Sequence, residues 1–274
     1  MDRSIQFKNY SEKQNKNKIK YIEWILYNEY TDVILIKSEY HPSIFQVDKN
    51  NLKITKQNTE LIPSSNNLYF GVQKYTGNYI YTCLNNSHIF IYDKYFGHLY
   101  DINTHIQPYY YSPLVSYTCS DKYGNIYCSG RLSTNIADTN IIIKYNEKGL
   151  YVKHTNIDLS NLFIHINLIC STTYNNQILS MDTYGSRLNI FDLELNHISK
   201  YKINIDYTAC NNKIFTNGDY LYLHNFYHTY VLDMRKLPNL VLEYDELKCS
   251  TISLVDDKLL VYKDEEFSYL ENIL

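Results

Sequence analysis

Glycine and proline are scarce in this sequence, and long apolar runs are missing from it. The chain of 274 residues has 8 Gly and 5 Pro. Because no run of 18 apolar residues occurs, we expect no transmembrane helix and no membrane partner. The first ten residues, MDRSIQFKNY, lack the apolar core that a secretory signal peptide needs. The sequence therefore predicts a cytoplasmic protein.

Framework cysteines, a basic charge excess and common catalytic motifs are also missing. The six cysteines lack disulfide-framework spacing, which favours reduced thiols. The formal charge is −3, so we expect no nucleic-acid partner. No Gly-x-Ser-x-Gly, P-loop, HExxH or GxGxxG pattern occurs. We therefore assign no catalytic residue, no metal ligand and no cofactor, although these absences leave an enzyme possible.

Tyrosine, in contrast, is very frequent, with 31 residues. Asn, Ile and Lys are abundant too, and all four have AT-rich codons. Tyr and Ile favour strands, whereas Asn favours turns. Codon bias and an all-β fold predict the same composition, so composition alone does not separate them.

A short apolar stretch that ends in a turn-forming polar residue recurs along the whole chain. The six copies are IFQVDK (44–49), IFIYDK (89–94), IIKYNE (142–147), LNIFDL (188–193), TYVLDM (229–234) and FSYLEN (267–272). Their polar residues, Asp48, Asp93, Asn146, Asp192, Asp233 and Glu271, recur at intervals of 38 to 53 residues. An Asx side chain at this point can bond to the backbone two residues on and reverse the chain. A period of 40 to 50 residues made of short strands is typical of propeller blades.

A second marker has the same period: a Gly, Asn or Asp turn followed by an apolar strand, as in Gly77-Asn78 before Tyr79–Tyr81. Together the markers predict an all-β, six-bladed β-propeller of four-stranded antiparallel blades, forming a single domain over residues 1–274. The expected blades span residues 18–57, 67–104, 113–156, 166–204, 208–245 and 248–274. The last lacks a fourth strand, and the N-terminal strand 4–10 is expected to supply it and close the ring. A β-sandwich or two small β domains are the alternatives.

The segment Ser120–Ser129, SDKYGNIYCS, resembles the Asp-x-x-Gly-Asn-apolar-aromatic repeat of NHL, SMP-30-like and two-component-regulator propellers. Thr76–Tyr81, TGNYIY, is a weaker echo of it. The resemblance implies the fold and carries no residue role. This sequence has no initial Glu motif that matches the calcium-binding residues of SMP-30-like lactonases.

The spacing of two residue pairs is informative, and the second pair suggests a metal site. A two-residue turn at Tyr123-Gly124 would place Cys119 and Cys128 opposite each other in a hairpin, as neighbouring reduced thiols. His224 and His228 would share an ion only if a turn separated them, because residues four apart on a strand lie ~13 Å from each other. Packing between blades and ordinary surface roles are the competing interpretations.

The remaining functional signal is aromatic and lies in the loops that do not repeat. In a propeller, the loops after the second and fourth strands of each blade open on one face. There the sequence places side chains typical of protein-interface hot spots. These candidate binding residues are Tyr109, Tyr110, Tyr111, Arg131, Phe163, Tyr184, Arg187, Phe226 and His228. The alternative is that each aromatic residue packs against its own blade.

Three functions remain open on this basis. The first is a non-enzymatic propeller, a scaffold that binds a protein or peptide through this tyrosine-rich face. The second is a metal-dependent enzyme of the lactonase or hydrolase kind, with its site in the central channel. The third is a structural subunit of a larger assembly.

Overall fold

Six four-stranded β-sheets account for most of the described chain. The computed structural model describes residues 7–9, 22–38, 43–58, 68–73, 75–83, 88–104, 114–133, 138–157, 168–182, 187–203, 205, 213–224, 227–238, 240–244, 247 and 250–270. Within these residues every element is a β-strand except the 3₁₀ turn Met234–Lys236. The strand pairings are antiparallel, which confirms the predicted all-β class and the four-stranded repeat. No helix of the described part is long and apolar enough to cross a membrane.

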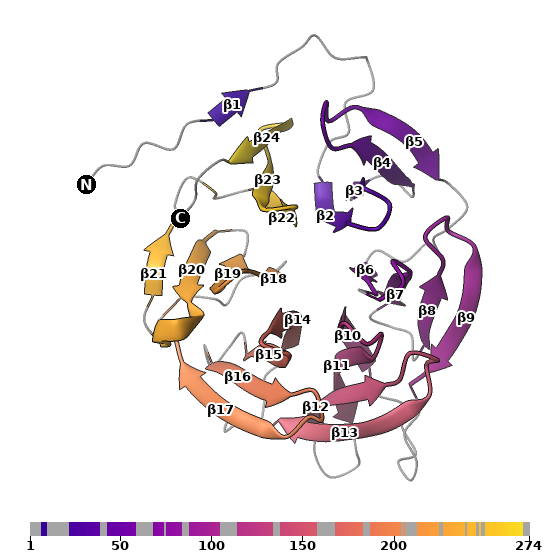
Figure 1. Ribbon diagram of the computed structural model, residues 1–274, viewed down its shortest axis with the longest axis vertical. Coiled ribbons are helices and arrows are strands. Elements are labelled where there is room, and N and C mark those ends of the chain that lie inside the picture. Colours follow the sequence, from indigo (N-terminus) through magenta and orange to yellow (C-terminus); the bar gives the residue numbers. More distant parts are fainter. Residues whose placement is uncertain are drawn as a thin grey trace. The chain divides into compact units, whose positions relative to one another are not determined.

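The chain divides into two compact units, which are described separately. The first unit comprises Met1–Asn66, Phe226–Thr229 and Tyr244–Leu274, and the second comprises Asn67–Asn225 and Tyr230–Glu243. Within each sheet the chain passes through neighbouring strands in order, apart from the sheet that contains β1 (Figure 1).

The first unit contains two sheets. One consists of β2 (Ile22–Asn28), β3 (Val33–Ser38), β4 (Ile44–Asp48) and β5 (Ile54–Asn58). The other consists of β22 (Thr251–Val255), β23 (Lys258–Lys263), β24 (Glu266–Leu270) and β1 (Phe7–Asn9). β1 pairs antiparallel with β24, with Phe7 opposite Leu270 and Asn9 opposite Ser268.

The second unit contains four sheets, each in the order of the sequence. The first consists of β6 (Leu68–Val72), β7 (Tyr79–Cys83), β8 (His88–Tyr92) and β9 (His98–Asn103), and the second of β10 (Leu114–Ser120), β11 (Ile126–Ser133), β12 (Asp138–Tyr145) and β13 (Tyr151–Ile157). The third consists of β14 (Leu168–Tyr174), β15 (Gln177–Asp182), β16 (Arg187–Asp192) and β17 (His197–Lys202). The fourth consists of β18 (Lys213–Asn217), β19 (Tyr220–His224), β20 (Thr229–Asp233) and β21 (Leu240–Glu243).

Several strands in the middle of the sheets are buried on both faces. Val33–Ser38 and Thr229–Asp233 are buried at nearly every position, whereas the outer strand His197–Lys202 is largely exposed. A strand covered on both faces needs a continuous apolar run, because both sets of alternating side chains leave water. This explains why the recurring stretches found in the sequence are largely apolar.

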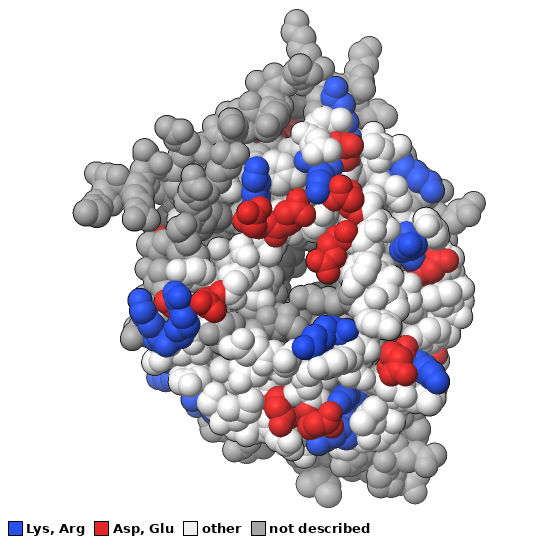
Figure 2. Space-filling model, in the orientation of Figure 1, with Lys and Arg blue, Asp and Glu red and all other residues white. Residues whose placement is uncertain are grey.

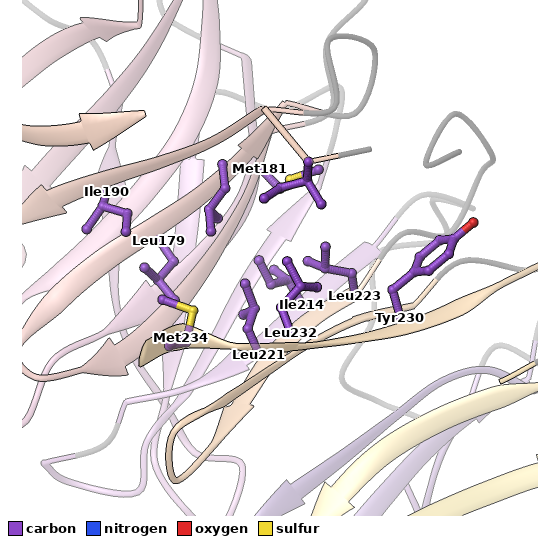
Figure 3. Packing of buried hydrophobic residues seen from close by; sticks show 11 residues of the cluster. Leu179, Met181, Ile190, Ile214, Leu221, Leu223, Tyr230, Leu232 and Met234 are labelled. Carbon is purple, nitrogen blue, oxygen red and sulfur yellow. The ribbon is translucent and has the colours of Figure 1, made fainter. Parts of the chain in front are cut away.

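Neighbouring sheets of the second unit pack face to face through separate apolar clusters. Leu179 and Ile190 of one sheet meet Leu221 and Leu232 of the next, and Figure 3 shows these side chains pointing toward one another. A second cluster joins β6–β9 to β10–β13, and a third joins β10–β13 to β14–β17. In the first unit one cluster joins β2–β5 to β22–β24.

The polar residues that end the recurring stretches act as the predicted turn-formers. Each accepts a hydrogen bond at Oδ1 from the backbone N–H two residues on. The pairs are Asn50 to Asp48 at 2.9 Å, Tyr95 to Asp93 at 2.8 Å, Lys148 to Asn146 at 3.0 Å, Glu194 to Asp192 at 2.9 Å and Arg235 to Asp233 at 3.0 Å. The sixth residue, Glu271, lies outside the described residues.

A β-bulge follows this turn in five sheets, between the third strand and the fourth. The extra residue is an exposed aliphatic side chain in three of them: Leu99, Val152 and Ile198. Bulges increase the twist of an outer strand and discourage pairing with another chain. The outer edges of these sheets are therefore poor templates for pairing with a strand of another chain.

The predicted hairpin register of the two cysteines is wrong by one residue. Cys119 lies opposite Tyr127, and Cys128 lies opposite Thr118. The turn is one residue longer than expected, because the backbone N–H of Asp121 bonds to the carbonyl of Asn125. A shift of one residue places the two thiols on opposite faces of the sheet. Both are buried and reduced.

Candidate functional site

Four turns share one construction that presents a tyrosine to solvent. Each begins with an Asn, Gln or Asp at the end of a strand, and a tyrosine follows two residues later. In three of them the tyrosine N–H donates to the first residue's Oδ1: Tyr30 to Asn28 at 3.1 Å, Tyr95 to Asp93 at 2.8 Å and Tyr123 to Asp121 at 2.8 Å. The exposed fractions are 47% for Tyr30, 61% for Tyr75, 76% for Tyr95 and 57% for Tyr123.

Three of these tyrosines belong to the second unit, and we call Tyr75, Tyr95 and Tyr123 the turn tyrosines. Their turns are connected to one another. Gln73 Nε2 donates to the carbonyl of Gly124 at 2.7 Å, which joins the turn of Tyr75 to that of Tyr123. The turn of Tyr95 belongs to the same sheet as the turn of Tyr75, the sheet β6–β9. Phe96 in this turn stacks on Tyr79 of β7, with ring centroids 4.6 Å apart.

Gly124 allows the close approach of these turns. Its φ is +88°, a conformation that residues with a Cβ rarely adopt. A Cβ at this position would lie 3.4 Å from the Cβ of Tyr75 and 3.1 Å from that of Glu147. Glycine therefore permits both the turn and its contacts with Glu147 of the same sheet and Tyr75 of the neighbouring sheet.

The carboxylate of the Tyr123 turn points inward. Asp121 is buried and accepts hydrogen bonds from the backbone N–H groups of Tyr123 and Asn125, from Asn125 Nδ2 and from the Tyr127 hydroxyl. That hydroxyl also lies 3.0 Å from the carbonyl of Leu193 in the next sheet. Burial, followed by the charge of Asp121, raises the pKa of Tyr127, so the phenol stays protonated. Asp121 therefore organises the turn and the contact between sheets.

The lysines of these turns lie outside, against the tyrosine rings. Lys94 Nζ lies 5.3 Å from the centroid of the Tyr95 ring, and Lys122 Nζ lies 5.1 Å from that of Tyr123. Both lysines are exposed. A cation over an aromatic face is attracted by the ring's negative face, at ~0.5–1 kcal/mol in exposed sites. Tyr95 and Tyr123 are thus flanked by ammonium groups.

A second polar cluster lies in the first unit and connects its two sheets. The Tyr27 hydroxyl lies 2.7 Å from Asp32 Oδ1 and 2.8 Å from Asp256 Oδ1. Lys49 Nζ lies 2.6 Å from Asp32 and 3.0 Å from Asp256, so the ammonium is the counter-ion of both carboxylates. Its hydrogen bond lowers the pKa of Asp32, and burial raises that of Tyr27. We interpret this cluster as a structural connection.

A third cluster surrounds Asp233 in the second unit. Arg235 binds both carboxylate oxygens of Asp233, with Nε 2.8 Å and one terminal nitrogen 2.9 Å away. The guanidinium also lies 3.2 Å from Asp219 and 5.6 Å from the ring of Tyr220. The hydrogen bond from Arg235 lowers the pKa of Asp233 to about 2. This arrangement fixes the 3₁₀ turn after β20. Within the described ranges, no group of three His, Cys, Asp or Glu residues could hold a metal ion.

Most of the predicted binding residues lie outside the described residues. These are Tyr109, Tyr110, Tyr111, Phe163, Tyr184 and Phe226. Arg131, Arg187 and His228 are described at least in their backbone. The structure therefore does not test the predicted loop face as a whole.

Arg131 and Arg187 lie in strands, which corrects their expected place in loops. Arg131 is on β11 opposite Asn140, and the ladder continues to Ser133 opposite Asp138. Arg187 is the first residue of β16, opposite Asp182, and is half-buried. The hairpins are longer than expected because the strand pairing continues through polar residues, which the apolar pattern does not mark.

The two histidines of the predicted pair belong to different units. His224 is buried at the end of β19 in the second unit, whereas His228 is half-buried before β20 in the first. The turn tyrosines are not among the residues predicted from the sequence to bind a partner. The available signal was a tyrosine two residues after a polar residue that ends a strand, as in Asp93-Lys94-Tyr95 and Asp121-Lys122-Tyr123.

Comparison with solved structures identifies the fold. The chain is similar to a streptogramin B lyase, with a TM-score of 0.60 and 12% identity over 99% of this chain and 88% of that one. It is also similar to an inactive virginiamycin B lyase from Staphylococcus aureus, with a TM-score of 0.59 and 11% identity over 97% and 98% of the two chains. The Pan2 WD40 domain of Neurospora crassa gives a TM-score of 0.57 and 10% identity over 91% and 88%.

These neighbours include both an enzyme and a WD40 domain, so their names do not point to one function. No protein-family model matches the chain, and a search of curated proteins gave no match. At identities of 10–12% the likeness concerns the fold alone. The chain has a β-propeller fold.

Proposed function

We propose that this chain is a non-enzymatic β-propeller that binds a protein or peptide partner. The observation that carries the proposal is the set of turn tyrosines, which are 57–76% exposed, and the backbone N–H groups of Tyr95 and Tyr123 are each held by a turn hydrogen bond. Tyrosine is enriched in the energetic centres of protein interfaces, because it offers a large amphipathic contact area with few rotatable bonds. A tyrosine held by a turn hydrogen bond loses little further backbone freedom on binding.

The predicted loop face is a second surface within the same proposal. It comprises Tyr109, Tyr110, Tyr111, Arg131, Phe163, Tyr184, Arg187, Phe226 and His228. Loops on a rigid scaffold commonly carry specificity, which is why this surface is tested beside the turn tyrosines.

The finer description of the fold also belongs to this proposal. We infer six blades in one ring, closed by pairing of the N-terminal strand with the last blade, and a kinship with NHL-like propellers. The pairing of β1 with β24 and the six four-stranded sheets support the ring. The Ser120–Ser129 repeat supports the kinship. Closure would satisfy two sheet edges that are otherwise open.

Affinity purification from the cell that makes the protein tests the function. Wild type is compared with Tyr75→Ser/Tyr123→Ser and with the loop-face variant Tyr110→Ala/Arg187→Ala. The control is Ile198→Ser, which removes a side chain that is 50% exposed on the outer strand β17. We expect a reproducible partner that the turn variant loses and the control keeps.

The variants also assign the surface. Loss of the partner only in the loop-face variant would transfer the interface to the loops. Capture of the same partner by all variants would contradict both surfaces. A matched circular dichroism spectrum and melting curve for each variant separates loss of binding from loss of folding.

A further inference from the structure

The turn of Tyr123 separates its charges by depth. Asp121 is buried among backbone and side-chain donors, whereas Lys122 is exposed. In the turn of Tyr95 the half-exposed Asp93 accepts the N–H groups of Tyr95 and Gly97, and Lys94 is exposed. A ligand that approaches these turns from solvent meets Lys94 and Lys122, while the Asp121 carboxylate lies behind the surface and Oδ1 of Asp93 is engaged by the backbone.

The adjoining turn of β12–β13 adds one exposed charge of each sign. Glu147 and Lys148 are both exposed, and the Glu147 side chain lies beside Gly124. The exposed charges of the connected turns are then Lys94, Lys122 and Lys148 against Glu147. Figure 2 shows positive and negative side chains in small separate groups on the face that it draws, without one broad area of either sign. The local order of charges, more than net charge, decides what binds here.

We propose that this turn surface binds an acidic, extended segment of the partner protein. The inference rests on the proposed function and specifies the chemistry of the partner. Carboxylates of such a segment would accept hydrogen bonds from the ammonium groups of Lys94 and Lys122 and from the tyrosine hydroxyls. The rings supply flat apolar contact area for the rest of the segment. Rigid turns keep the ordering cost on this side of the interface low.

A nucleic acid is the competing anionic partner. Binding through phosphates depends on a continuous positive field and on many counterions released. Three exposed lysines in connected turns, one of them beside Glu147, provide few such contacts. An acidic peptide needs fewer ionic contacts and gains from packing on tyrosine. The experiment includes an oligonucleotide because its binding would overturn the inference.

Fluorescence anisotropy on the full chain tests the inference. The probe is a labelled 12-residue peptide of alternating Glu and Ser, and its matched analogue has Gln in place of Glu. We expect the Glu peptide to bind at least ~5-fold more tightly than the Gln peptide at low salt, with the difference shrinking as salt screens the charges. Equal binding of the two peptides, or tighter binding of a 12-nucleotide single strand, would overturn the inference.

Two charge-matched double variants locate the site. Lys94→Gln/Lys122→Gln removes the ammonium groups beside the tyrosines, whereas Lys200→Gln/Lys202→Gln removes two exposed lysines of the outer strand β17. We expect the first variant to weaken Glu-peptide binding at least ~5-fold and the second to leave it within ~2-fold of wild type. An equal effect of both variants would show a general charge effect and would contradict the site.

Failure of this inference can be told from failure of the proposed function. If a cellular partner is lost from Tyr75→Ser/Tyr123→Ser but the Glu peptide has no advantage over the Gln peptide, the acidic segment is wrong and the binding function stands. If no partner depends on the turn tyrosines or on the loop face, the proposed function is wrong. A Glu-peptide preference abolished only by Lys94→Gln/Lys122→Gln supports the inference.

Discussion

Replacing Gly149 by alanine tests how closely the turn between β12 and β13 packs on the neighbouring sheet. Gly149 has φ +75°, and a Cβ there would lie 2.8 Å from Ile102 Cγ1 and 2.9 Å from Tyr100 Cε2. Both distances are shorter than ordinary carbon contacts of ~3.5–4 Å. The substitution therefore adds backbone strain and a steric overlap with β9.

Gly218 provides the matched control, because it has the same backbone conformation without the neighbours. Its φ is +54°, and no atom lies within 4 Å of where its Cβ would be. The left-handed conformation alone costs about 1–2 kcal/mol for alanine. Overpacking in a well-filled site adds ~1–3 kcal/mol. We therefore expect Gly218→Ala to lower the free energy of unfolding by ~1–2 kcal/mol and Gly149→Ala by ~2–5 kcal/mol.

Urea denaturation followed by far-UV circular dichroism measures both values on the full chain. The informative quantity is the difference between the two variants, because the strain that they share cancels. A difference of at least ~1 kcal/mol supports the close packing of this turn against β9. Equal losses, or a larger loss for Gly218→Ala, would refute the reasoning.

Three further substitutions test the polar clusters. Tyr127→Phe removes a buried hydroxyl with two partners and should lower the free energy of unfolding by ~1–2 kcal/mol. Tyr123→Phe, at an exposed position, should change it by less than ~0.5 kcal/mol. Urea denaturation of both variants gives the comparison, and equal effects would contradict the structural role of the buried hydroxyl. The lowered pKa of Asp233 contributes stability that is present above its ordinary value near 4 and is lost as pH falls toward about 2. Thermal melts between pH 5 and pH 2 should show this loss in wild type and a smaller loss in Asp233→Asn; parallel curves would exclude the contribution. Lys49→Gln and Asp256→Asn should each lower the melting temperature. Because the two side chains contact each other, the double variant should lower the melting temperature by less than the sum of the two single effects. Additive decreases in melting temperature would contradict the contact.

The repeat could be predicted from the sequence because each level of structure repeats with it. The apolar stretches became third strands, and the Asx residues that follow them became turn-formers with bonds of 2.8–3.0 Å. Such turns depend on one side chain and its local backbone, so no distant contact is needed to recognise them. Strand pairing in order along the chain follows from short connections.

Register was harder to predict, because one residue in a turn changes every pairing beyond it. The sequence Asp121-Lys122-Tyr123-Gly124-Asn125 allows either a two-residue or a three-residue hairpin loop around Gly124. The longer loop is selected by the Asp121 carboxylate, which binds the N–H groups of Tyr123 and Asn125 together. Its partner Tyr127 is held in turn by Leu193 of the next sheet, a contact that a local pattern does not contain.

The turn tyrosines lie in repeating segments, and a repeated turn predicts a structural element before it predicts a binding site. On that basis turn formation would account for every residue of the segment. The hydrogen bonds of these turns show otherwise. Asp93 and Asp121 accept hydrogen bonds from the backbone N–H groups of Tyr95 and Tyr123, and these bonds do not involve the tyrosine side chains.

The cap binds only the backbone N–H of the residue two positions on, so it does not fix the identity of that residue, and the pattern of residues there is informative. In the turns between third and fourth strands this residue is Asn50, Tyr95, Lys148, Glu194 or Arg235, a varied and polar set. In three of the six turns between first and second strands it is tyrosine: Tyr30, Tyr75 and Tyr123. Composition bias would enrich tyrosine in both kinds of turn. Its concentration in the turns between first and second strands, with Tyr95 in the other kind and all four side chains left exposed, supports binding of a partner to the turn tyrosines.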